Sequence, residues 1–190
     1  MKRLLLFPVS GLAAFVLLQC GLFEPRDPED PSASGFGFLP QTTPDNVIAN
    51  LQTAIAKKSL RYYMDCFNDP ATSGLGFVFT PSVNLRNELA DWTYADEESY
   101  FRNLSGETQA DELSNLALSD VVRQSNGSDS AEVTAHYLLE FRHSRPTTPR
   151  VVRGSLQFFL FNNQSTWRIH RWIDNRTDTD STWSRLKKDF

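Results

Sequence analysis

Tyrosine and aspartate are the residue types in this sequence that best suit acid–base chemistry. The tyrosines on apolar faces are Tyr63, Tyr100 and Tyr137, and the carboxylates that could meet them are Asp65, Asp120 and Asp174. A carboxyl group in apolar surroundings can act as a general acid or base beside a tyrosine hydroxyl. The alternative is that the tyrosines fill the core with their hydroxyls at its rim, while Asp174 caps a turn at a strand end. We favour this second interpretation and assign no catalytic residue.

Other catalytic and metal-binding patterns do not occur. The sequence has no glycine-rich phosphate loop, no His-x-x-x-His pair and no Gly-x-Ser-x-Gly motif. The histidines are His136, His143 and His170. Alternation along the strands places His136 and His170 opposite the apolar faces, so we expect both on the outer surface of a sheet. The sequence therefore predicts no metal site and no cofactor.

The aromatic residues allow a second interpretation of the interior. They make up 12% of the chain, which favours a packed core over disorder. Six of them could instead line an apolar cavity between helices and sheet. These are Tyr63, Trp92, Tyr100, Tyr137, Phe158 and Trp167. A filled core is the commoner outcome in proteins of this size.

The elements that would position these side chains begin with helices. Thr43 followed by Pro44 is a typical helix start, and apolar residues then recur at helical spacing. Ser59 can cap a second helix, whose apolar stripe has Cys66 nearby as a buried, inert thiol. After a short apolar strand at 77–79, Thr93-x-x-Asp96 resembles a capping box. It predicts a third helix, with an apolar face formed by Glu97, Tyr100, Phe101 and Leu104.

After residue 112 the hydrophobic period changes from helix to strand. Apolar residues alternate from Leu116 to Val122, from Val133 to Phe141, from Val152 to Leu160, and again from Trp167. Asn126-Gly127 and Asn162-Asn163 lie in the turns between these runs, so an antiparallel meander is the economical arrangement. The alternation slips between Ile169 and Trp172, which predicts a β-bulge.

The first 20 residues have the layout of an export signal. Residues 1–19 have a charged start, an apolar run of about 15 residues and no charged flank beyond it, which predicts a signal peptide rather than a membrane-spanning helix. Leu17-Leu18-Gln19-Cys20 resembles a bacterial lipobox, although Gln19 replaces the usual small residue. We therefore expect Cys20 to carry lipid and to hold the protein on a membrane.

Residues 20–43 read as a lipidated cysteine and a proline-rich tether, and residues 44–190 as one domain. Phe36, Phe38 and Leu39 are apolar enough to lie back on that domain. The formal charge of the chain is −4, and it becomes −6 once Lys2 and Arg3 leave with the signal peptide. This acidic balance gives no electrostatic support to nucleic-acid binding.

The order helix, helix, short strand, helix and four long strands resembles the nuclear transport factor 2-like (NTF2-like) fold, also called SnoaL-like or cystatin-like. Several motifs are also similar to those of a group of uncharacterised bacterial lipoproteins with this fold. The motifs are Cys20-Gly21-Leu22-Phe23-Glu24-Pro25-Arg26-Asp27-Pro28-Glu29, Asn50-Leu51-x-x-Ala54-Ile55, Tyr62-Tyr63-Met64-Asp65-Cys66-Phe67, Trp167-x-Ile169-x-x-Trp172-x-Asp174 and Trp183-Ser184-x-Leu186-Lys187. The resemblance implies an α+β cone, with N-terminal helices packed on a curved antiparallel sheet of four to five strands. It carries over no catalytic residue, because the fold hosts many functions.

Three functional hypotheses remain open. The first is a non-catalytic envelope lipoprotein that binds a partner protein or small ligand, and the second is an enzyme of isomerase, cyclase or dehydratase type acting on a small apolar substrate. The third is a structural subunit that dimerises through a sheet face bearing Phe159 and Trp172. The basic stretch from Arg142 to Arg150 could meet anionic headgroups or an acidic partner, or could be a solvated loop. Because Gly21 rather than aspartate follows Cys20, we expect the periplasmic face of the outer membrane rather than the inner membrane.

Overall fold

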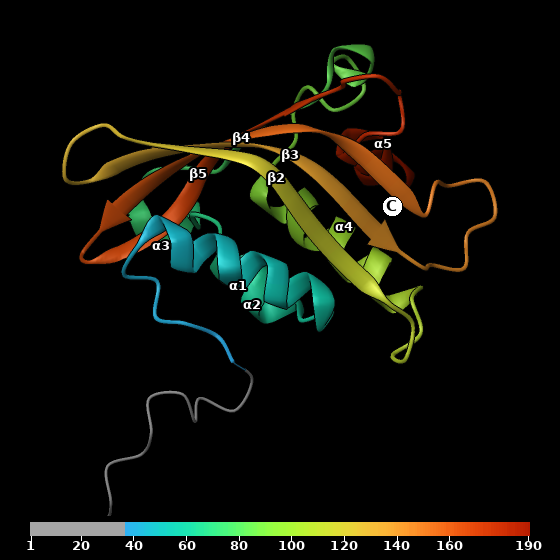
Figure 1. Ribbon diagram of the computed structural model, residues 1–190, viewed down its shortest axis with the longest axis horizontal. Helices are drawn as coiled ribbons and strands as arrows, with labels where there is room; N and C mark the ends of the chain where they lie inside the picture. The colour runs from blue at the N-terminus through green and yellow to red at the C-terminus, as the bar shows by residue number, and fades with distance from the viewer. Residues whose placement is uncertain (1–36) are drawn as a thin grey trace, which may run out of the picture.

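The computed structural model describes residues 37–190, which fold as helices packed under a curved sheet (Figure 1). The signal peptide, Cys20 and Phe36 lie outside the described residues. In chain order the elements are α1 (Pro44–Ala56), α2 (Leu60–Asp65), α3 (Pro70–Ser73), β1 (Val78–Thr80), the 3-10 helix η2 (Val83–Leu85), α4 (Tyr94–Gly106), β2 (Ser114–Ser125), β3 (Ser130–Phe141), β4 (Val151–Asn163), β5 (Thr166–Asn175) and α5 (Trp183–Asp189). This is the predicted α+β arrangement, with α3, η2 and α5 as additional helices.

The predicted helix starts are confirmed by their caps. The Thr43 hydroxyl accepts a hydrogen bond from the backbone N–H of Asn46, and Pro44 is the first residue of α1. At α4 the Thr93 side chain and the Asp96 carboxylate cap each other's backbone N–H groups, which completes the capping box. Ser59 precedes α2 without a side-chain capping bond.

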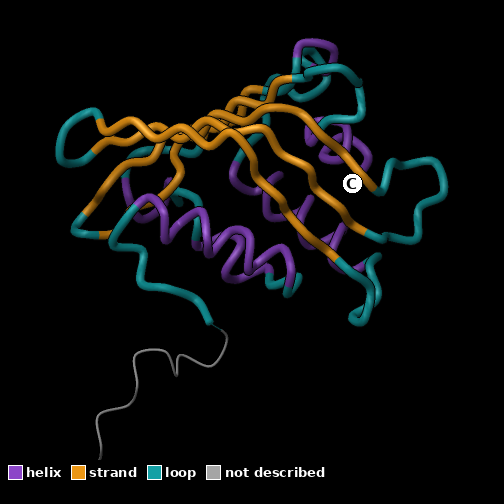
Figure 2. Tube along the Cα trace, viewed as in Figure 1, coloured by secondary structure: helices purple, strands orange, loops and turns teal. Residues whose placement is uncertain are grey.

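The sheet has the strand order β1-β5-β4-β3-β2. The strands β2 to β5 form the predicted antiparallel meander, and β1 joins the edge of β5 in parallel. The long strands arch over α1, α2 and α4, so one face of the sheet is covered and the other is open (Figure 2).

Two bulges change which side chains face inward. In β5, Leu160 pairs with Ile169 and Phe159 with Arg171, so His170 is the extra residue and the predicted bulge is confirmed. The expectation that Trp172 lies on the outer sheet face is wrong, because the bulge returns its fully buried side chain to the core. In β2 the pairing shifts at Asp120, whose φ is 51°, and Val122 beyond it is 52% exposed.

The hairpin between β4 and β5 turns two residues later than predicted. Asn162 and Asn163 belong to β4, and the turn is formed by Gln164 and Ser165. Both have positive φ angles, 50° and 65°, which a tight two-residue hairpin requires.

The end of the tether packs on the helices through Phe38, as expected, whereas Leu39 is 47% exposed. Phe38 is buried and its ring stacks on Tyr62 with 3.7 Å between centroids. The Asn50 side chain accepts a hydrogen bond from the backbone N–H of Leu39 and donates one to its carbonyl, each 2.7 Å long. Cys66 is fully buried, as predicted, and burial raises the pKa of its thiol. Among residues 37–190 there is no helix with the length and hydrophobicity needed to span a bilayer.

Candidate functional site

Two carboxylates, Glu97 and Asp174, are fully buried between the helices and the sheet. Glu97 lies one turn into α4, on the face that packs inward, and Asp174 lies near the end of β5. A buried carboxylate is costly unless it is paired and hydrogen-bonded, and such groups often mark functional sites. These two residues therefore define the candidate site.

Glu97 is bound by three different side chains. Its Oε1 accepts a hydrogen bond from the Tyr63 hydroxyl at 2.6 Å, and its Oε2 accepts one from the Trp92 indole N–H at 2.8 Å. The Lys187 ammonium, from α5, forms an ion pair with the same Oε2. Neither the Glu97 nor the Lys187 side chain has any exposed surface. The carboxylate thus has its charge balanced and its oxygens occupied by the protein itself.

The Lys187 ammonium is also surrounded by aromatic rings. Its Nζ lies 4.0 Å from the centroid of Trp172, 4.2 Å from that of Phe79, and 5.1 Å from those of Trp92 and Tyr100. These distances fall within the range of cation–π attraction, which is strongest where water is excluded. We call these four rings, together with Glu97, the ammonium cage.

Asp174 holds α5 in place. Its Oδ2 accepts hydrogen bonds from the backbone N–H and the hydroxyl of Ser184, and its Oδ1 accepts one from the Tyr137 hydroxyl at 2.7 Å. The Tyr137 oxygen in turn accepts a bond from the backbone N–H of Trp183, and the Trp183 indole donates to the Tyr100 hydroxyl oxygen at 2.9 Å. The first turn of α5 is therefore fixed by a buried polar network rather than by packing alone.

Burial sets the protonation of these groups. It lowers the pKa of Lys187 to about 8, although the attraction of Glu97 acts in the opposite direction. It raises the pKa values of Tyr63, Tyr100 and Tyr137 well above 10, and the neighbouring carboxylates raise them further. Burial also raises the pKa of Asp174, while its bonds from Ser184 and Tyr137 partly offset that rise. The three tyrosines therefore remain protonated at neutral pH, and Tyr63 and Tyr137 donate their hydroxyl protons to Glu97 and Asp174.

The space between helices and sheet is filled by side chains. Trp172, Trp183, Tyr63 and Tyr100 are at most 1% exposed, and α5 adds Leu186 and Lys187 from the open end. A surface hollow of about 290 Å³ borders this end, with Trp92, Tyr100 and Lys187 among its lining residues. In this arrangement Lys187 occupies the volume where a small substrate would have to meet Glu97.

The six residues predicted to line a pocket lie in four places. Tyr63, Trp92 and Tyr100 belong to the surroundings of Glu97 and Lys187, and Tyr137 binds Asp174. Phe158 packs against Trp172 with ring centroids 5.3 Å apart. Trp167 is buried at the opposite end of β5, where its backbone N–H donates to the carbonyl of Gln41.

The other candidate acids and bases are not brought into this interior. Asp65 and Asp120 are exposed, as is His136, and His170 is half-buried beside Phe159 on the outer sheet face. Among the described residues no cluster of histidine, cysteine or acidic side chains has the arrangement to hold a metal ion.

Glu97 and Lys187 were not identified as site residues from the sequence. Glu97 was nevertheless placed on the apolar face of a predicted helix, and an acid on a buried stripe is the signal that could have identified it. Lys187 gave no comparable signal, because a lysine in the last turn of a short helix is ordinarily a solvated, dipole-compensating residue.

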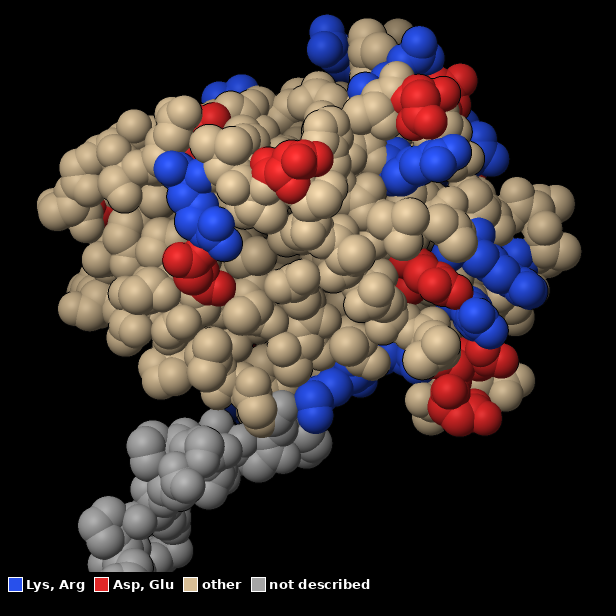
Figure 3. Space-filling view, viewed as in Figure 1, with Lys and Arg blue, Asp and Glu red and all other residues tan. Residues whose placement is uncertain are grey.

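The arginines of the basic stretch after β3 mostly bind acidic or carbonyl groups of the protein itself. Arg145 forms a bidentate pair with Glu107, and its guanidinium lies 4.0 Å from the centroid of the Phe190 ring. Arg142 pairs with Glu140, and Arg150 donates to the carbonyl of His143. Basic and acidic side chains are also interspersed over the face shown in Figure 3. We therefore find no unbroken positive patch on that face.

Comparison with known proteins identifies the fold. No family model matches the chain, and no curated protein matches it in sequence. Among solved structures, a candidate scytalone dehydratase from Novosphingobium aromaticivorans superposes with a TM-score of 0.56 at 9% identity, covering 72% of this chain and 83% of that protein. A candidate aromatic ring hydroxylase from the same species gives 0.52 at 14% identity, covering 75% and 92%. A candidate dehydratase of the NTF2-like family from Streptomyces avermitilis gives 0.51 at 12% identity, covering 72% and 100%. At these identities the likeness shows that the chain has the NTF2-like fold.

Proposed function

We propose that this chain is a membrane-anchored, non-catalytic module of the cell envelope, attached through lipid on Cys20 and acting by binding a protein partner on the outer face of its sheet. The observation that carries the proposal is the occupied interior. Lys187 lies against Glu97 in the buried interior, and Tyr63 and Trp92 bind the same carboxylate. A general acid or base must reach the proton that it transfers, and this carboxylate is buried behind the protein's own donors.

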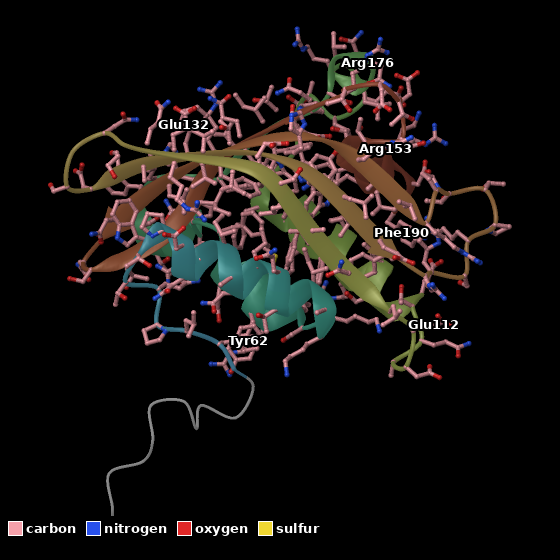
Figure 4. All side chains as sticks on the ribbon, in the orientation of Figure 1. Tyr62, Glu112, Glu132, Arg153, Arg176 and Phe190 are labelled. Carbon is pink, nitrogen blue, oxygen red and sulfur yellow. The ribbon has the colours of Figure 1, made fainter. Side chains whose placement is uncertain are left out.

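The outer face of the sheet supplies a surface for such a partner. Leu138 is 41% exposed on β3, and Phe159 and Ile173 lie half-buried on neighbouring strands. Charged side chains separate these apolar groups, and Glu132 and Arg153 project from this face away from the helices (Figure 4). A non-obligate interface is overall about as apolar as the rest of a protein surface, so a face of this mixed composition is compatible with a transient partner.

The enzyme alternative rests on the names of the structural neighbours, which include candidate dehydratases and a candidate hydroxylase. It requires a small apolar compound to bind inside the cone. We expect such compounds to leave the melting temperature of the protein unchanged, because a ligand raises it only by binding the folded state. A concentration-dependent rise with a cyclic ketone or phenol, abolished by Glu97→Gln, would favour the enzyme.

Anchoring is tested by labelling cells with radioactive palmitate. We expect the wild-type protein to take up label and to fractionate with the outer membrane, and Cys20→Ser to do neither. Cys66→Ala is the matched control, because the Cys66 thiol is fully buried and should not affect labelling. Label retained by the Cys20→Ser variant would refute the anchor.

The partner surface is tested by placing a photo-crosslinking amino acid in the chain in intact cells. At position 138, on the outer sheet face, we expect a discrete crosslinked product, identified by mass spectrometry as an envelope protein or a second copy of this chain. The control is position 75, because Leu75 has a similar exposure, 39%, but lies next to α3. Equal products from both positions, or none from position 138, would contradict this assignment.

A further inference from the structure

We propose that the ammonium cage is a binding site for a small organic ammonium ion, which the Lys187 side chain occupies as an internal ligand. This inference concerns the interior rather than the partner surface, and it adds to the proposed function a state in which Lys187 is withdrawn and an external ammonium ion takes its place. The composition of the cage, its position beneath a surface hollow and the origin of its residues outside α5 support it.

The composition of the cage matches the chemistry of an organic cation. Four aromatic rings lie within 5.1 Å of the Lys187 Nζ, and their faces carry the negative part of the ring quadrupole. Glu97 supplies a full negative charge at the same point. An apolar ligand would leave that carboxylate without a counter-charge, and an anion would be repelled by it. The cage therefore selects for a positively charged group of ammonium size.

Most of the cage is independent of the helix that supplies its occupant. Phe79 comes from β1, Trp92 from the loop before α4, Tyr100 and Glu97 from α4, and Trp172 from β5. Tyr63 of α2 and Trp92 hydrogen-bond Glu97 without any contribution from α5. Withdrawal of Lys187 thus removes the cation and leaves the rings and the carboxylate on the rest of the fold.

The cage also adjoins the surface at one place. The hollow of about 290 Å³ at the open end has Trp92, Tyr100 and Lys187 among its lining residues, although the Lys187 side chain itself has no exposed surface, so the cage lies directly beneath this hollow. Lys188 and Glu88, which form an ion pair with each other, also line the hollow. Between Asp174 and α5 the chain runs through exposed residues, including Arg176 and Asp178.

The test uses Lys187→Ala, which removes the internal ligand. We expect n-butylammonium to raise the melting temperature of this variant, with an apparent affinity at least about tenfold higher than that of 1-butanol, a neutral analogue of similar size. The tenfold preference is what one favourable charge interaction of about 1.4 kcal/mol provides. The double variant Glu97→Gln/Lys187→Ala is the control and should lose that preference. Equal effects of the amine and the alcohol on Lys187→Ala would overturn the proposal.

A second measurement uses the wild-type protein and decides the question should Lys187→Ala fail to fold. Reductive methylation modifies accessible amines, so Lys187 should be protected while Lys188, whose side chain is 36% exposed, is modified. Tetramethylammonium chloride, compared with sodium chloride at equal ionic strength, should increase the modification of Lys187 and leave that of Lys188 unchanged. Continued protection of Lys187 at the highest tetramethylammonium concentration would then reject the site.

Discussion

At the scale of single residues, the interior depends on one buried ion pair. Burying two charges is expensive, and their attraction offsets that cost only when the remaining hydrogen-bonding capacity is satisfied. Here the Tyr63 hydroxyl and the Trp92 indole satisfy Glu97, while aromatic rings surround Lys187. The intact pair should therefore contribute little to the free energy of unfolding, whereas removing one partner should destabilise the protein strongly.

We expect Lys187→Met and Glu97→Gln each to lower the free energy of unfolding by about 3–5 kcal/mol, because each leaves the other group buried without its counter-charge. The double variant should lose less than the sum of the two single losses, since it removes both charges together. Urea unfolding followed by circular dichroism measures all three values. Additive losses would show that the two side chains do not interact.

The pH dependence of stability follows from Lys187. Its pKa is about 8 in the folded protein against an ordinary 10.5, so between these values the unfolded chain binds more protons than the folded one. Stability should therefore rise with pH across this window, as the cost of burying the charge disappears. The raised pKa values of the buried tyrosines act in the opposite direction above about pH 10.

This prediction is measured as the difference in unfolding free energy between wild type and the double variant Glu97→Gln/Lys187→Met, from pH 7.5 to 9.5. The double variant keeps all the tyrosines, so they largely cancel in the difference. We expect the difference to grow in favour of wild type as pH rises. A difference that stays flat or shrinks would mean that Lys187 does not titrate in this range.

The sequence predicted the surroundings of the site better than its charged centre. The sequence places Tyr63 and Tyr100 on apolar faces and offers Trp92 as an aromatic residue that could line the interior, and the structure brings all three around Glu97 and Lys187. The ion pair itself joins residues 90 positions apart. Hydrophobic periodicity shows which face of an element is buried, but not which distant charge will meet it.

At the scale of elements, the long and strongly periodic segments were predicted, as were the short α2 and β1, whereas α3 and α5 were missed. The caps of α1 and α4 and the four long strands have clear local signals. Helix α3 has 4 residues and lies in a segment rich in turn-forming residues, and the 7 residues of α5 form less than two full helical repeats. The sequence predicts the last hairpin turn at Asn162 and Asn163, two residues too early. The actual turn residues, Gln164 and Ser165, are not the asparagine and glycine that usually adopt positive φ.

Two glycines offer a matched test of packing at this scale. A Cβ on Gly154 of β4 would lie 2.5 Å from the backbone carbonyl oxygen of Asn175 and 2.8 Å from the Tyr137 hydroxyl, whereas a Cβ on Gly106 of α4 would meet nothing within 4 Å. We expect Gly154→Ala to destabilise the protein by about 1–3 kcal/mol through overpacking. Gly106→Ala should be neutral or slightly stabilising. Denaturant titration of both variants decides the point, and similar effects would contradict it.

The attachment of α5 gives a further prediction. Asp174→Ala leaves the Ser184 backbone N–H and the Tyr137 hydroxyl without their acceptor, at a cost of about 1–3 kcal/mol for each buried group. We expect hydrogen exchange in peptides covering α5 to accelerate more than exchange in β3 or β4. Asp178→Ala, in the exposed loop before α5, is the control and should leave the exchange of α5 unchanged. Equal acceleration in every strand would instead indicate global destabilisation.

At the scale of the whole molecule, the described residues share one core. The sheet covers the helices along its length, and α5 closes the open end against β1, α4 and β5 (Figure 1). We expect a single cooperative unfolding transition, with circular dichroism and tryptophan fluorescence giving the same midpoint. Three of the four tryptophans, Trp92, Trp172 and Trp183, lie around α5. An earlier fluorescence transition would show that α5 releases before the sheet unfolds.

The position of Lys187 has a consequence for how the protein is made. The residues that complete the interior are the last elements of the described chain to leave the ribosome, and Glu97 precedes its partner by 90 residues. Until α5 emerges, the growing polypeptide holds an unneutralised acid among exposed tryptophans and tyrosines. Such an intermediate cannot complete its native core, and it exposes apolar surface to which chaperones bind.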